Sequence, residues 1–123
     1  MEYKMNMDEL VGMLTNKIAE ASYKARITEY LANICSNSDG MRRESNALHE
    51  HAFAWIEVLN TVTGTEKGNE IYLDAQRDAS GDIRQARNPD ANRNDAIRVL
   101  MAAAGYSGET INTKIVFENA SQI

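Results

Sequence analysis

The chain has 123 residues, a formal net charge of −5, and a composition of 43% hydrophobic and 25% charged residues, which together indicate one globular domain with a buried core. The negative balance argues against a protein that coats nucleic acid through a broad Lys/Arg surface. Since no apolar run approaches the roughly 20 residues that a membrane-spanning helix needs, we expect no membrane association.

The start of the chain, MEYKMNMDEL, lacks the apolar segment of a secretory signal peptide. Cys35 is the single cysteine, so no disulfide can form within the chain. Together these two features predict a cytoplasmic protein.

The first predicted helix covers residues 7–35, with Asp8 as its N-cap and the polar segment SNSDG after it. One face carries an apolar stripe along the whole helix. The second half carries a further stripe on another face, formed by Tyr23, Ile27, Tyr30, Leu31 and Ile34. A helix in a small monomer normally needs one apolar face, so either a second copy or the chain's own other segments cover this stripe. We adopt the first alternative and predict a homo-oligomer with these five residues at its interface.

The second predicted helix covers residues 41–63 and ends at Gly64. It contains two histidines, His49 and His51, in the stretch LHEHAFAW. Two positions on a helix are separated by roughly 160 degrees around its axis, so these side chains cannot bind one metal ion. A zinc-binding helix would need them four residues apart, and only a strand would place them on one face. We therefore expect no metal, with His51 lying against Trp55 one turn later.

The third segment, residues 65–87, is predicted to form a helix with little apolar area, broken near Ser80 and Gly81. Ile71, Leu73 and Ala75 alternate in the manner of a short strand, which is the alternative.

The fourth predicted helix covers residues 87–105. Asn88 is expected to cap it, Pro89 to occupy its first position, and Gly105 to terminate it.

Four arginines give this part of an acidic chain a local positive charge: Arg84, Arg87, Arg93 and Arg98. Guanidinium groups suit bidentate contacts with phosphate or carboxylate. We predict that these arginines bind a phosphorylated ligand or an acidic partner. The alternative is a solvated face with local ion pairs to Asp82, Asp90 and Asp95.

The C-terminal segment AAAGYSGETINTKIVFENASQI resembles part of a helix-turn-helix motif, with matches at Ala104, Gly105, Ser107, Thr110 and Ile111. In that motif a glycine turn precedes the helix that enters the DNA groove. Alternating β-branched and aromatic residues over 111–117 fit a short β element instead. The sequence leaves both alternatives open.

Catalytic patterns are weak throughout the sequence. It contains no phosphate-binding glycine loop, nucleophile elbow or metal-ligand spacing. Cys35 falls on the apolar face of the first helix, where we expect it to be part of the core. We predict that the protein is not an enzyme and needs no cofactor.

A long helix, a break around ICSNSDG, and then RRES and EHAFAW on a second helix follow one another in this chain. This order resembles the small helical phage proteins that sequester cyclic oligonucleotide immune signals, whose second helix carries a glutamate, an alanine and a tryptophan that Glu50, Ala52 and Trp55 match. The resemblance implies a multimeric helical assembly that binds its ligand without chemical turnover, in the host cytoplasm if a phage encodes the chain.

The sequence thus predicts a single, mainly α domain over residues 1–123 with about four helices, in which the long N-terminal helix packs on the second long helix. The expected function is a non-catalytic, homo-oligomeric binding protein of the phage counter-defence type, which sequesters a nucleotide signal or blocks a host defence protein. The alternative is a small DNA-binding transcriptional regulator that uses the segment near 97–117.

Overall fold

The computed structural model is mainly α, with no strand among the residues that it describes. These residues are 6–34, 39–88, 90 and 92–105. Its helices are α1 (Met7–Ile34), α2 (Asp39–Thr63), α3 (Lys67–Ala86) and α4 (Arg93–Ala103). The prediction of a small helical domain with a long N-terminal helix packed on a second long helix is confirmed.

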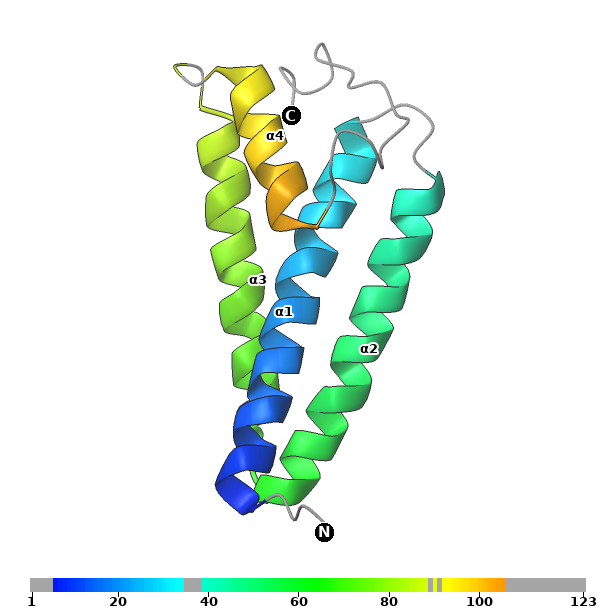
Figure 1. Ribbon diagram of the computed structural model, residues 1–123, viewed down its shortest axis with the longest axis vertical. Helices are drawn as coiled ribbons and strands as arrows, with labels where there is room; N and C mark the ends of the chain where they lie inside the picture. Colours follow the sequence, from blue (N-terminus) through cyan, green and yellow to red (C-terminus); the bar gives the residue numbers. More distant parts are fainter. Residues whose placement is uncertain (1–5, 35–38, 89, 91, 106–123) are drawn as a thin grey trace, which may run out of the picture.

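The helices run alternately up and down (Figure 1). α2 returns antiparallel along α1, α3 runs back beside α1, and the short α4 descends along the upper half of α1 and α3. α1 therefore lies between α2 on one side and the α3 and α4 pair on the other. None of these described helices has the combination of length and apolarity that crossing a bilayer requires.

Local hydrogen bonds and glycines set the helix ends. Asn6 rather than Asp8 caps α1, because its Oδ1 accepts a hydrogen bond from the Glu9 backbone N–H at 2.8 Å. α2 ends at Gly64 as predicted, and the φ of +69° at this glycine lies in the left-handed region that other residues rarely adopt.

The fourth helix begins later than the sequence predicted. Asn92 caps α4 by accepting a hydrogen bond from the Asp95 backbone N–H at 3.2 Å. Asn88 instead accepts from the Asp90 backbone N–H at 2.9 Å, which makes a local turn. The end of the helix is as predicted, since Gly105 follows the C-cap with a φ of +86°.

α3 is continuous from Lys67 to Ala86, so the predicted break near Ser80 and Gly81 is wrong, as is the alternative strand over 71–75. Ala79 and Ile83 on either side of the glycine are buried in the core. Their burial holds the helix together through a residue whose helix propensity is lower than that of alanine by about 1 kcal/mol.

The core has two apolar clusters separated by a layer of small side chains. The lower cluster joins Leu14 and Ile18 of α1 to Ile56 and Leu59 of α2. The upper cluster joins the second half of α1 to α3 and α4. Between them along α1 and α2 lie four buried residues: Ser22, Ala25, Ser45 and Ala52. Here the Ser45 hydroxyl donates a hydrogen bond to the Ala25 carbonyl at 2.9 Å, which ties α2 to α1 at close range.

The predicted oligomer interface on α1 is wrong for four of its five residues. Ile27, Leu31 and Ile34 have no exposed surface within a single chain, and Tyr30 is only 3% exposed. α3 and α4 cover this stripe, with Ile83, Ile97 and Leu100 in the same cluster. Tyr23 is half-buried at its edge. The two-faced helix is thus the central helix of its own chain, and a homo-oligomer would need another surface.

Several sequence predictions fall on residues that the structure does not describe. They are the β element at 111–117, the recognition-helix part of the DNA-binding motif, and the core position of Cys35. Within 97–117, only residues 97–103 are helical in the described part of the chain, as the second half of α4.

Replacing Gly68 with alanine is expected to destabilise the fold by roughly 1–3 kcal/mol, because the new methyl group has no room. Its Cβ would lie 3.0 Å from both the Cα and the carbonyl oxygen of Ile56, where α3 starts against α2. Gly81→Ala is the matched control, since it lies within the same helix with open space at its Cβ. It should stabilise the protein by roughly 0.5–1 kcal/mol. Urea unfolding followed by circular dichroism measures both, and equal effects would contradict the close contact.

Candidate functional site

A hollow of about 490 Å³ opens between α1 and α3. We call it the α1–α3 groove. It is lined by Asn16, Ala19, Glu20, Tyr23, Lys24, Ile71, Asp74, Ala75 and Asp78. No residue of α4 lines it, because α4 has 11 residues whereas α3 has 20. The short fourth helix thus leaves the lower part of the α1 and α3 face uncovered (Figure 1).

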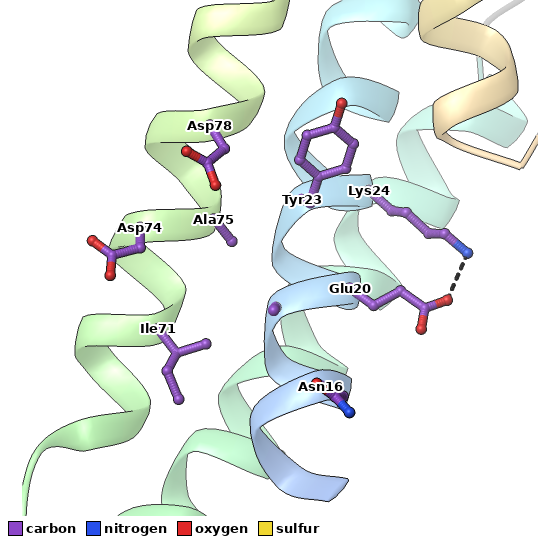
Figure 2. Close-up of a pocket in the computed structure, with 9 residues that line it drawn as sticks. Asn16, Glu20, Tyr23, Lys24, Ile71, Asp74, Ala75 and Asp78 are labelled. Carbon is purple, nitrogen blue, oxygen red and sulfur yellow. Dashed lines mark hydrogen bonds and ion pairs between the residues drawn. The ribbon is translucent and has the colours of Figure 1, made fainter. Parts of the chain in front are cut away.

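The floor of the α1–α3 groove is apolar. Figure 2 shows Ile71 and Ala75 pointing from α3 toward α1. Ala19 contributes from α1, and Ala75 is 7% exposed. Small side chains on both helices leave space that a larger residue would fill, so another chain segment can approach the two backbones closely.

Charged side chains stand on both rims of the α1–α3 groove. Figure 2 shows Asp74 pointing from α3 away from α1, Asp78 in front of α3, and Glu20 and Lys24 projecting from α1 on the side away from α3. Three carboxylates and one ammonium group therefore border the groove. The lining is acidic and would attract cations and repel phosphates.

Two of the three carboxylates have a cationic neighbour on their own helix. Glu20 pairs with Lys24 at 2.9 Å, and this hydrogen bond and the charge of Lys24 lower the pKa of the Glu20 carboxyl. Asp74 pairs with Arg77 at 3.2 Å. Asp78 has no hydrogen-bond or ion-pair partner within the part of the chain that the structure describes.

Tyr23 closes the upper end of the α1–α3 groove. Its hydroxyl donates a hydrogen bond of 2.5 Å to Oδ2 of Asp82 on α3. Burial, followed by this hydrogen bond and the negative charges of Asp82 and Asp78, raises the pKa of Tyr23 to about 12. The phenol is therefore a neutral hydrogen-bond donor at physiological pH, and its hydrogen bond joins α1 to α3.

A second hollow of about 250 Å³ lies above Tyr23, between α3 and α4. Tyr23 and Asp82 line it together with Val99, which is 67% exposed. Tyr23 belongs to both hollows, so it separates the open lower part of the face from the part that α4 covers.

A third hollow of about 210 Å³ lies between α1 and α2. His51 and Trp55 both line it, and the predicted contact between these two side chains stays a prediction. The ammonium group of Lys17 lies 5.3 Å from the Trp55 ring centroid, a cation–π distance.

His49 lies elsewhere on α2, in a group of rings with the half-buried Tyr72 and the exposed Phe53. The Tyr72 hydroxyl lies 3.4 Å from Nδ1 of His49. The structure therefore keeps the two histidines apart. Among the described residues, no group of three or more His, Cys, Asp or Glu side chains could hold a metal ion.

The predicted arginine site is not brought together at a cavity. Arg84, Arg87 and Arg98 are exposed and line none of these three hollows, and the Arg93 side chain is outside what the structure describes. Within the described part, none of the three exposed arginines pairs with a carboxylate. Their predicted role in ligand binding stays a prediction.

Sequence reasoning missed the α1–α3 groove, although one signal of it is present. Asp74 and Asp78 are four residues apart and flank Ala75, so on a helix they form an acidic ridge beside a small residue. The depth of the groove depends on where α4 ends and on how α3 lies against α1, and neither can be read from α3 alone.

Comparison of the chain with protein-family models, with curated proteins and with solved structures gives no match. The chemistry of the α1–α3 groove therefore has to be inferred from its own residues.

Raising the pH through the alkaline range is expected to weaken the fold partly through Tyr23. Its pKa is raised from 10.0 to about 12 in the folded state, so the folded chain keeps a proton that the unfolded chain loses. The free energy of unfolding therefore falls as the pH rises from about 10 to about 12, and this contribution is intact below about 10. Tyr23→Phe should make that fall shallower in urea unfolding measured across this range.

The companion variant Asp82→Asn keeps a hydrogen-bond acceptor and removes the charge. It should lower the titration midpoint of the phenol that ionises at the highest pH. Ultraviolet absorbance measures this midpoint, under conditions where circular dichroism shows intact helices. A pH dependence of Tyr23→Phe identical to that of the unmodified protein would contradict the assignment.

Proposed function

We propose that the chain is a non-catalytic binding protein whose α1–α3 groove receives a helical segment of a partner protein. The observation that carries this proposal is the open apolar floor beside a fourth helix that covers only the upper part of the same face. α4 already occupies the continuation of this groove as a helix. A second helix could therefore lie in the groove, in line with α4 and below its C-terminal end.

The floor supports a helix in this position. Helices pack with their axes 8–10 Å apart, and the shorter distances in this range require small residues at the contact. Ala19 and Ala75 supply them on the two facing helices. An amphipathic helix laid in an apolar groove is a common mode of peptide recognition, with anchors one turn apart on one face.

The polar groups of the groove support binding rather than catalysis. They are exposed carboxylates, one amide, one ammonium group and a phenol with a pKa of about 12. At physiological pH this phenol stays protonated. The residues that line the groove include no serine, cysteine or histidine.

The acidic lining also favours one version of the counter-defence hypothesis. A nucleotide signal carries phosphates, which the carboxylates Glu20, Asp74 and Asp78 would repel. Blocking a host protein requires only a complementary surface. We therefore propose a protein partner in preference to a nucleotide or to duplex DNA.

Selection from a display library of amphipathic 14-residue helices tests the proposal on the full chain. Peptides that bind should lose nearly all affinity for Ala19→Phe, because the new ring fills the floor of the groove. Ala54→Phe makes the same change at an exposed position on α2 that lines none of the three hollows and should leave binding unchanged. Circular dichroism and urea unfolding check that both variants fold. If no selected peptide distinguishes the two variants in fluorescence anisotropy, the proposal is wrong.

A further inference from the structure

On the basis of the proposed function, we infer that the partner segment is a cationic amphipathic helix, with Lys or Arg on both flanks of a short apolar stripe. This inference names the chemistry of the partner. It stands on the geometry of the rims of the α1–α3 groove, whereas the proposed function stands on its floor.

The dimensions of the groove fix the length of the contact. Its lining runs from Asn16 to Lys24 on α1 and from Ile71 to Asp78 on α3. At about 1.5 Å per residue these stretches measure about 12 Å and about 10 Å. The floor therefore takes about two turns of a helix, which present apolar residues at positions i, i+3 or i+4, and i+7. Above this point the Tyr23 and Asp82 pair stops further entry.

The charges decide which helix fits. A helix on the apolar floor has Asp74 and Asp78 along one side and Glu20 along the other, with Asp82 at its upper end. Lys and Arg have long aliphatic stems, so residues on the flanks of the partner can reach these outward-facing carboxylates while their stems cover the rim. Acidic flanks would meet three carboxylates, of which Glu20 and Asp74 are paired with Lys24 and Arg77 and Asp78 has no cationic partner among the described residues.

The carboxylates are available to such a partner. Asp78 is exposed and has no partner among the described side chains. Glu20 and Asp74 have only local pairs on their own helices, and the carboxylates of both pairs are more than half exposed. Exposed pairs of this kind contribute little to stability, so a cation from the partner can share or replace them.

Two other segments could bind in the α1–α3 groove, namely a segment of a second copy of this chain and the chain's own residues 106–123. Gly105 lies beside the groove, since a Cβ at this position would be 3.9 Å from Nζ of Lys24. The carboxylates on the rims favour a cationic partner over these two alternatives, because both of the alternatives are acidic. The chain as a whole has a net charge of −5, and residues 106–123 contain two acidic residues, Glu109 and Glu118, against one basic residue, Lys114.

The first test is the composition of the helices selected on the full chain. Those whose binding depends on position 19 should be enriched in Lys and Arg on both flanks of the apolar stripe. Their affinity should fall steeply as salt rises, since the Debye length is about 10 Å at 0.1 M and about 3 Å at 1 M. Selected helices with neutral or acidic flanks that depend on position 19 would overturn the cationic inference and leave the proposed function standing.

The second test uses charge reversal with a matched control. Asp78→Lys should weaken a selected cationic helix roughly five- to tenfold at low salt and have little effect at high salt. Glu57→Lys makes the same change in net charge on the exposed face of α2 and should leave the affinity within about twofold. Equal losses in the two variants would show general attraction to an acidic protein and overturn the inference.

The third test distinguishes the occupants. Benzoylphenylalanine placed at position 16 of the full chain, at the end of the groove, should cross-link to the added cationic helix on irradiation. Mass spectrometry of the product identifies the partner. A cross-link to residues 106–123 or to a second copy, retained in the presence of saturating peptide, would overturn the inference.

Discussion

The burial of α1 on two opposite sides is the constraint on which the rest of the structure depends. α2 covers one side, and α3 and α4 cover the other. Ile27, Leu31 and Ile34 are completely enclosed as a result. Burying a side chain of this size stabilises a fold by about 1.5–3 kcal/mol relative to leaving it exposed. α3 and α4 are held in place mainly by this surface, because α3 itself offers mostly alanines.

The same arrangement creates the α1–α3 groove. The small residues Ala19 of α1 and Ala75 of α3 line it, whereas most of the large buried side chains of α1 lie in the lower and upper clusters. α4 covers the upper cluster and then ends at Ala103. Tyr23 stands at this boundary and joins α1 to α3 through Asp82. The α1–α3 groove is therefore open below the Tyr23–Asp82 hydrogen bond because α4 is short.

We base the proposed function on the charges of the groove and not on the arginines. Glu20, Asp74 and Asp78 border one hollow, whereas Arg84, Arg87 and Arg98 are exposed and border none of the three. Local charge density in a linear sequence identifies a stretch of chain, but recognition depends on which charges surround one cavity. An acidic rim around an apolar floor is complementary to a basic helix.

The sequence by itself determined the helices, their approximate bounds and the glycines that end two of them, because periodicity and left-handed turns are local properties. It also showed that α1 has two apolar faces, and that His49 and His51 point to different sides of α2. Only the tertiary structure decided what covers the second face, that Gly81 stays helical, and where the acidic groove lies. These outcomes depend on contacts between residues far apart in the chain, such as Tyr23 with Asp82, which no local pattern encodes.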